Sequence, residues 1–381
     1  MSTIVPGPIS RTLESQILSD LDKKIVLLSG PRQVGKTYLS QRLFPDHFQY
    51  LSFDSNPDRQ MIRQQSWIRD QELIIFDEIH KMRDWKRWLK GIYDTEGVRP
   101  RLLATGSARM DIFRRGGDSL AGRHHLHRLH PFSVAELKSV LSPSEALASI
   151  IQLGGFPEPL LSQSEEAASR WRKSHLDRIL REDLLDLEKV RELKRLEILV
   201  DLLSERVGST LSYASLAKDL EVSPHTVKKW IQILENLFVI FTVRPYSKNI
   251  SRSILKEPKI YFFDTGRVNG SPGSRLENAI ACALLKRQHF LEDTKGETRG
   301  LYYLKDKDKK EIDFLTVQGK KPEYLIEVKV SDGNPAPALA HYSKVLSPIR
   351  TVQLVQNLTR EQQFNSVEIR NAANWLASLE S

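Results

Sequence analysis

A phosphate-loop pattern near the amino end constrains the fold of this chain more than any other feature. An apolar run at 24–28 predicts a buried strand, and residues 30–37 match the pattern G-x-x-x-x-G-K-T. Gly30 and Gly35 let the backbone curl so that successive N–H groups point inward at a polyphosphate. A helix expected to begin at Lys36 directs the positive end of its dipole at the same anion. The pattern therefore predicts a strand, a phosphate-binding loop and a helix in immediate succession.

Side chains of the loop supply the remaining chemistry. Lys36 can reach the β- and γ-phosphates as a point charge, and the Thr37 hydroxyl can ligate Mg²⁺. We therefore expect ATP and Mg²⁺ as cofactors; the alternative is a tight glycine turn followed by a surface lysine. The residues expected to surround the nucleotide are Gly30, Pro31, Arg32, Gln33, Val34, Gly35, Lys36, Thr37 and Tyr38.

A second motif, Leu-Ile-Ile-Phe-Asp-Glu at 73–78, predicts a buried parallel strand that ends in two acids. Asp77 would hold the magnesium ion through water or through Thr37. Glu78 would orient and deprotonate the attacking water. Four apolar residues before two acids are common in proteins, but downstream of a phosphate loop the combination is specific.

A third apolar segment, 101–104, predicts a strand between the other two, and it ends in Thr-Gly-Ser. Ser107 would then sense the γ-phosphate as a catalytic polar group. The alternative is that Ser107 caps a helix beginning at the next residue.

Two further segments, Ala-Gly-Arg at 121–123 and Pro-Phe-Ser-x-x-Glu at 131–136, complete the set. With the three motifs above, they resemble the AAA+-type ATPases of prokaryotes that carry a C-terminal restriction-endonuclease-like domain. The resemblance extends from about residue 21 to residue 332 and implies a homo-oligomer in which one subunit's arginine reaches its neighbour's γ-phosphate. Arg123 is the first choice for that arginine and Arg109 the second. The alternative for either is a surface arginine or a structural ion pair.

Composition favours an acidic partner and a cytoplasmic location. The formal net charge is +9 and the pI is about 9.4, which makes DNA the expected partner. The longest apolar stretches are too short to span a bilayer, and residues 1–10 lack the features of a secretory signal, so we expect no membrane partner. The single cysteine, Cys282, cannot form an intramolecular disulfide, which agrees with a reducing compartment.

The middle of the chain predicts helices followed by a winged helix. Residues 212–230 have the pattern of a helix-turn-helix, in which Ser223 caps the second helix and Pro224 takes its first position. Two β-rich pieces, 237–243 and 259–263, follow as a wing would, with basic residues between them. The outward residues of the second helix lack the arginine and asparagine that read bases, so DNA contact would be mostly to phosphates. The alternative is an interaction module that does not bind DNA.

The carboxy-terminal part places four chemical residues on predicted elements. Glu277 lies in the first turn of a helix, Asp313 in one strand, and Glu327 and Lys329 two apart on one face of another. This arrangement resembles the PD-(D/E)xK nuclease fold, although Ile312 stands where that fold usually has proline. The resemblance implies that Asp313 and Glu327 hold Mg²⁺, that Lys329 assists the reaction, and that Glu277 completes the site. The alternatives are an inactive scaffold that binds nucleic acid or protein, or a surface ion pair.

The expected fold class is α/β with four parts. These are an AAA+-like P-loop domain at 1–153, a helical lid or connector at 154–205, a winged-helix-like domain at 206–268 and a nuclease-like α/β domain at 269–381. The expected function is Mg²⁺-dependent ATP binding and hydrolysis on or with DNA, with a metal-dependent nuclease at the carboxyl end. The alternative is a regulatory or scaffold ATPase whose other domains only bind protein or nucleic acid.

Overall fold

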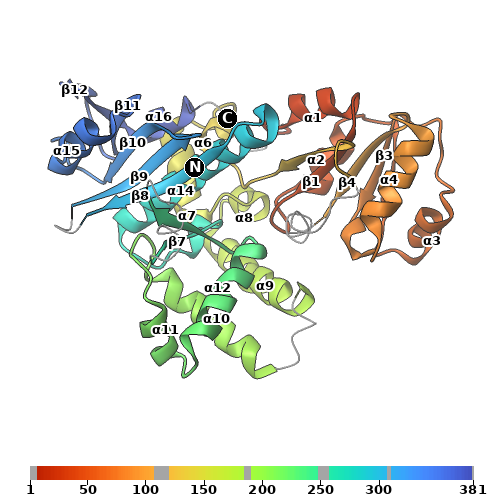
Figure 1. Ribbon diagram of the computed structural model, residues 1–381, viewed down its shortest axis with the longest axis horizontal. Coiled ribbons are helices and arrows are strands. Elements are labelled where there is room, and N and C mark those ends of the chain that lie inside the picture. Colours follow the sequence, from red (N-terminus) through yellow and green to blue (C-terminus); the bar gives the residue numbers. More distant parts are fainter. Residues whose placement is uncertain (1–6, 107–119, 184–189, 248–256, 307–309, 380–381) are drawn as a thin grey trace.

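The computed structural model describes residues 7–106, 120–183, 190–247, 257–306 and 310–379, and its strands form two sheets (Figure 1). The amino-terminal sheet has the order β2-β3-β4-β1-β5, and every neighbouring pair is parallel. Its strands are β1 (Ile25–Ser29), β2 (Phe48–Ser52), β3 (Leu73–Asp77), β4 (Arg101–Thr105) and β5 (His124–Arg128). The third predicted strand, β4, therefore lies between the phosphate-loop strand and the acidic strand, as the sequence predicted.

Both faces of this sheet are covered, which explains why β1 and β3 are buried throughout and why their first four residues are all apolar rather than alternating with polar ones. Successive side chains of β1 join different cores: Val26 and Leu28 belong to one buried cluster, Ile25 and Leu27 to another. The covering elements include α1 (Glu14–Leu21), α2 (Lys36–Arg42), α3 (Asn56–Gln64), η1 (Ile79–Lys81) and α4 (Trp85–Glu96).

Helices occupy the middle of the chain. They are α6 (Val134–Leu137), α7 (Pro143–Leu153), α8 (Pro157–Ser162), α9 (Glu165–Asp183), α10 (Val190–Ser204), α11 (Tyr213–Asp219) and α12 (Pro224–Asn236). The helix pair expected at 212–230 is present as α11 and α12. Ser223 accepts a hydrogen bond from the Thr226 amide at 3.1 Å, and Pro224 is the first residue of α12, as predicted. No helix in the described ranges combines the length and apolar character needed to cross a bilayer.

The second sheet crosses the boundary expected at residue 268. Its order is β12-β13-β11-β10-β9-β8-β6-β7. The strands are β6 (Ile240–Pro245), β7 (Lys259–Phe262), β8 (Arg299–Lys305), β9 (Glu311–Gln318), β10 (Lys321–Lys329), β11 (Arg350–Val355), β12 (Gln362–Phe364) and β13 (Val367–Asn371). The hairpin expected as a wing, β6 and β7, is thus one end of the carboxy-terminal sheet, because β6 pairs in parallel with β8.

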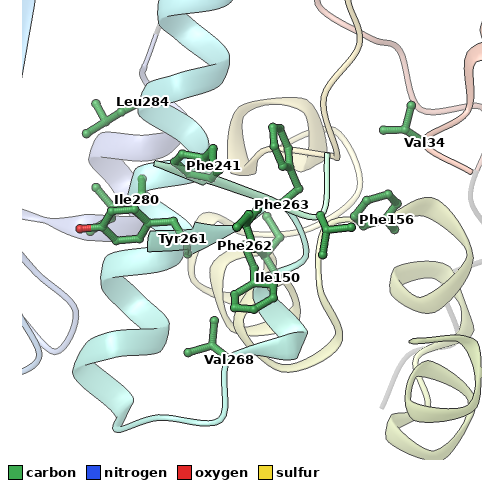
Figure 2. Close-up of a cluster of buried hydrophobic side chains, with 14 of the residues drawn as sticks. Val34, Ile150, Phe156, Phe241, Tyr261, Phe262, Phe263, Val268, Ile280 and Leu284 are labelled. Atoms are coloured by element: carbon green, nitrogen blue, oxygen red, sulfur yellow. The ribbon is translucent and has the colours of Figure 1, made fainter. Parts of the chain in front are cut away.

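A long helix, α14 (Pro272–Lys295), connects the two ends of the molecule. It packs against β7, β8, β9 and β10 of the second sheet and against β5 of the first. The remaining elements are η3 (Thr265–Arg267), α15 (Pro337–Leu346) and α16 (Ala372–Ala377). Figure 2 shows aromatic side chains of β6 and β7 beside Ile280 and Leu284 of α14, in the same buried cluster as Val34 and Phe156. One continuous apolar core therefore extends from the phosphate loop to the carboxy-terminal sheet.

This core predicts a large loss of stability when an inner aromatic side chain is removed. Phe262→Ala should lower the free energy of unfolding by about 3–5 kcal/mol, because the side chain is fully buried and leaves a cavity. Phe364→Ala is the matched control, since Phe364 is 40% exposed, and it should cost less than about 1 kcal/mol. Urea denaturation followed by circular dichroism measures both; equal losses would contradict the continuous core.

Candidate functional site

The phosphate loop leaves the carboxyl end of β1 and curls as the glycine spacing predicted. Gly30 and Gly35 have φ angles of 146° and 98°, which side chains with a Cβ rarely adopt. A Cβ on Gly30 would also collide with the backbone carbonyl of Leu129, the residue after β5. Gly35 is the residue before α2, so the loop ends where the helix dipole begins.

Lys36 lies inside this loop and is only 7% exposed. Its ammonium donates hydrogen bonds to the carbonyl oxygens of Gly30, at 3.0 Å, and Pro31, at 2.8 Å. These contacts hold the charge at the inner face of the loop, where the sequence placed the phosphates.

Asp77 is the centre of a hydrogen-bond network at the carboxyl edge of the sheet. Its carboxylate accepts hydrogen bonds from the Thr37 hydroxyl, at 3.2 Å, and from the hydroxyls of Tyr50 and Thr105. Burial and the neighbouring Asp77 carboxylate raise the pKa of Tyr50, so the phenol remains a donor at neutral pH. The structure thus brings together Thr37 and Asp77, the two residues expected to hold magnesium.

Tyr50 and Thr105 were not selected from the sequence as site residues. Thr105 is the last residue of β4 and Tyr50 the middle residue of β2, the two strands that flank β3. The signal that identifies them is strand order: a hydroxyl on a strand next to the acidic strand can reach its carboxylate.

Glu78 follows β3 in a left-handed conformation, with φ of 54°. One carboxylate oxygen lies 3.5 Å from Nδ1 of His80 and 4.0 Å from the Lys81 ammonium. Burial raises the pKa of Glu78, while the positive charge of Lys36 opposes that shift. A carboxylate with a raised pKa is a stronger base for a proton of water.

An open cavity of about 390 Å³ joins these groups. Its walls include residues 32–33 and 35–38 of the loop and of α2, both acids of the second motif, and Arg178 of α9. Arg178 was missed because the sequence showed only a charged helix with an apolar stripe. One turn earlier on α9, His175 donates from Nε2 to the Arg32 carbonyl at 3.2 Å, so this helix contacts the loop directly. Burial lowers the pKa of His175 to about 3, and the imidazole is neutral.

A second cavity of about 340 Å³ adjoins the first and shares Gly35, Tyr38 and Pro157 with it. Apolar side chains dominate its walls, among them Ile9, Leu39 and Leu161. The combined site is therefore polar and charged at one end and apolar at the other.

Arg123 lies at the opposite edge of the sheet from the phosphate loop. It precedes β5, beside the amino end of β1, and its Nε is 2.6 Å from Oδ1 of Asp94. Within its own chain it contacts neither cavity, and its role toward a neighbouring subunit stays a prediction. Ser107 and Arg109 lie outside the described residues.

The four residues expected to form a nuclease site are brought together by α14, β9 and β10. The Lys329 ammonium lies 2.7 Å from Glu327 Oε1, and the Val328 amide donates to Asp313 Oδ2 at 2.9 Å. Burial, together with the negative charge of Asp313, raises the pKa values of Glu277 and Glu327 to about 7. The negative charges of these carboxylates are therefore close together and only partly balanced by nearby positive charges.

Lys259 is the compensating charge. In the sequence it stood among the basic residues of a wing, but in the structure it is 1% exposed and points into this cluster. Its Nζ lies 2.7 Å from Glu311 Oε1, 3.3 Å from Glu277 Oε1 and 3.6 Å from Asp313 Oδ1. Burial opposes the charge, yet the surrounding carboxylates raise the pKa of Lys259.

A divalent cation does not fit this donor set while the ammonium lies among the three carboxylates. At the amino-terminal site, by contrast, Thr37 and Asp77 offer the hard oxygen donors that Mg²⁺ prefers.

Comparison with known families divides the chain into three segments. Residues 22–138 match the model of an AAA domain, whereas residues 144–271 and 272–374 match two domains of unknown function (DUF8612 and DUF4143). Uncharacterized proteins of Mycobacterium tuberculosis and Mycobacterium bovis are each 30% identical over 246 residues, which is 64% of this chain and 54% of theirs. The chain thus spans about half the length of these curated relatives. An uncharacterized protein of Methanocaldococcus jannaschii is 24% identical over 382 residues, covering 90% of this chain and 82% of that protein.

Among solved structures, the Aeropyrum pernix ORC1 protein in complex with DNA aligns over 73% of this chain and 95% of its own, at 13% identity and a TM-score of 0.34. A signal transduction ATPase with numerous domains from Pyrococcus horikoshii aligns over 76% of this chain and 48% of its own, at 14% identity and a TM-score of 0.29. These scores are too low to establish a shared overall fold. The AAA-domain match covers the phosphate loop, the acidic strand and the Pro-Phe-Ser-x-x-Glu segment, and it supports a P-loop ATPase domain over residues 22–138.

Proposed function

We propose that the amino-terminal domain binds Mg·ATP and hydrolyses it. The observation that carries this proposal is the convergence of Lys36, Thr37, Asp77 and Glu78 on one open cavity, next to an apolar one. A triphosphate fits the charged end, and a purine base fits the apolar end.

Each side chain has a distinct task in this mechanism. Lys36 turns from the carbonyls of Gly30 and Pro31 to the β- and γ-phosphates. A magnesium ion held by Thr37 and Asp77 would neutralise charge on the same phosphates. Glu78 accepts the proton of the attacking water.

Variants of Lys36 and Glu78 distinguish ATP binding from ATP hydrolysis. Lys36→Ala should abolish ATP binding, whereas Glu78→Gln should bind ATP normally and hydrolyse it about 100-fold more slowly, because only the base is lost. Calorimetry and phosphate release measure the two effects. Lys23→Ala, an exposed lysine away from the cavity, is the control. Normal hydrolysis by Glu78→Gln would refute its assignment as base.

The hydroxyls around Asp77 should set the affinity for magnesium. Thr105→Val and Tyr50→Phe each remove one hydrogen bond to the carboxylate with little change of shape. Each should raise the Mg²⁺ concentration for half-maximal hydrolysis by about tenfold, as is typical when partners of a metal ligand are lost. An unchanged magnesium requirement in both variants would show that Asp77 is positioned without them.

Self-association and DNA contact belong to the same proposal. Arg123→Ala should slow hydrolysis without weakening ATP binding if Arg123 reaches a neighbour's γ-phosphate. Asp94→Asn breaks the same ion pair but keeps the arginine, so an equal loss in both variants would identify a purely structural pair. Gel filtration with a non-hydrolysable nucleotide should show a larger species.

The net charge and the exposed Lys228 and Lys229 on α12 support contact with DNA phosphates. Each lysine-to-alanine change should then weaken binding to any DNA sequence and lower the salt slope by about one.

For the carboxy-terminal domain we favour the non-cutting alternative, because the Lys259 ammonium lies among the carboxylates that a metal ion would need. Plasmid incubated with Mg²⁺ or Mn²⁺, with and without ATP, should remain intact. Lys259→Met should allow Mn²⁺ to bind, measured by calorimetry against Lys305→Met, a lysine that pairs only with the outer Glu311 among the described ion pairs. Cutting that is lost in Asp313→Ala and Lys329→Ala but survives Lys36→Ala would establish a nuclease instead.

A further inference from the structure

A buried charge network connects the amino-terminal domain to the helix α14 of the carboxy-terminal domain, and its Arg11 also lines the apolar cavity beside the phosphate loop. Glu136 of α6 lies between Arg11, which precedes α1, and Lys286 of α14. Arg11 Nε is 3.1 Å from Glu136 Oε1, and the Lys286 ammonium contacts Oε2. The three side chains are less than one-tenth exposed. Glu136 also accepts from the amides of Thr12 and Ser133, at 3.1 and 3.2 Å, which fixes its position.

The amino-terminal end of this network reaches the phosphate loop. Arg11 donates from Nη1 to the backbone carbonyl of Val34 at 3.1 Å, and its guanidinium also contacts the His130 carbonyl. The guanidinium lies 4.3 Å from the centre of the Phe132 ring. Val34 is an inner residue of the loop, and a fixed carbonyl at this position fixes the orientation of the following N–H group. Arg11 is therefore placed to hold the loop in its phosphate-binding shape.

The other end of the network belongs to the carboxy-terminal domain. Lys286 donates further hydrogen bonds to the Pro131 carbonyl, at 3.2 Å, and to the Ser133 hydroxyl, at 3.3 Å. Nine residues earlier, about 14 Å along the same helix, α14 carries Glu277 into the acidic cluster. A movement of α14 therefore displaces Lys286 and Glu277 together.

Lys286 is the residue of this network whose charge can change at moderately alkaline pH. The positive charges of Arg11 and Lys286 overcome the effect of burial and hold the pKa of Glu136 at about 2. Burial lowers the pKa of Lys286 to about 8, although Glu136 opposes this shift. The other titratable groups facing the network are His130 and His289, and Nε2 of His130 lies 2.8 Å from Nδ1 of His289. Burial keeps the pKa of His130 well below its usual value, so that ring does not change charge near pH 8.

We propose that Arg11 is a positioning residue of the nucleotide site and that Lys286 sets its position through Glu136, so that ATP binding and the packing of α14 are coupled. The inference rests on the proposed ATP binding. Coupling is reciprocal: whatever shifts α14 changes the affinity for ATP, and ATP stabilises the packing of α14 by the same factor.

Three variants of α14 test the coupling. Lys286→Met should lower the affinity for a fluorescent ATP analogue about tenfold, within the usual range of coupling between two sites. Lys295→Met, an exposed lysine on the same helix, should leave the affinity unchanged. The wild-type affinity should fall as the pH rises through about 8, where the ammonium is lost, whereas Lys286→Arg should keep its affinity to at least pH 9. If Lys286→Met does not fold, the pH dependence of Lys286→Arg compared with wild type still tests the coupling.

Hydrogen exchange without nucleotide separates this inference from the ATPase proposal. Exchange at the amides of residues 32–36 should be faster in Lys286→Met than in wild type, whether or not ATP binds. Mg·ATP should in turn slow exchange along α14 of the wild type. Unchanged loop exchange in Lys286→Met, or the same decline of affinity above pH 8 in wild type and Lys286→Arg, would overturn the coupling. A wild-type chain that binds no ATP but shows the loop effect would instead overturn the ATPase proposal alone.

Discussion

The order of strands in the amino-terminal sheet is the constraint on which the candidate site depends. Because β4 lies between β1 and β3, the phosphate loop and the acidic strand end about 10 Å apart, two strand spacings across the sheet. That separation leaves room for phosphates and a metal ion between Lys36 and Asp77. It also places the end of β4 beside Asp77, so Thr105 contacts the carboxylate directly. If β1 and β3 were direct neighbours, these side chains would meet one another with less space between them.

The sequence was sufficient for features that depend on local spacing. The phosphate loop, the acidic strand, the intervening strand and the capped helix α12 lie where the pattern placed them, because glycine conformations, strand burial and helix caps involve residues close in the chain. Residues joined over long distances could not be found in this way. Tyr50, Arg178 and Lys259 looked like ordinary strand, helix and wing residues, and only the pairing of β2 with β3 or the packing of α9 and β7 reveals their partners.

The acidic cluster illustrates why motif residues alone do not define chemistry. Glu277, Asp313 and Glu327 are close together, and burial raises the pKa values of all three. The negative charge of Asp313 adds to the shift of Glu277 and Glu327, and that of Glu311 adds to the shift of Asp313. Such a cluster needs a cation, which a divalent metal or an ammonium can supply. The sequence contains the carboxylates of a metal site, but Lys259 comes from β7, a strand that the motif does not include. The positive charge beside these carboxylates is therefore supplied by a residue outside the motif. It is present because the sheet continues into β6 and β7.

The same reasoning explains why the coupling that we propose between the domains would pass through α14. An apolar core joins them, but the hydrophobic effect is non-directional and does not by itself select one position. A buried carboxylate held by two cations is far less tolerant of movement, because loss of one partner leaves a buried charge with neither a counter-charge nor water around it. Glu136 therefore gives the interface a defined position, whereas the surrounding core gives it stability. Because Arg11 also contacts the Val34 carbonyl, that defined position extends to the phosphate loop, and α14 carries it to the acidic cluster at the other end of the chain.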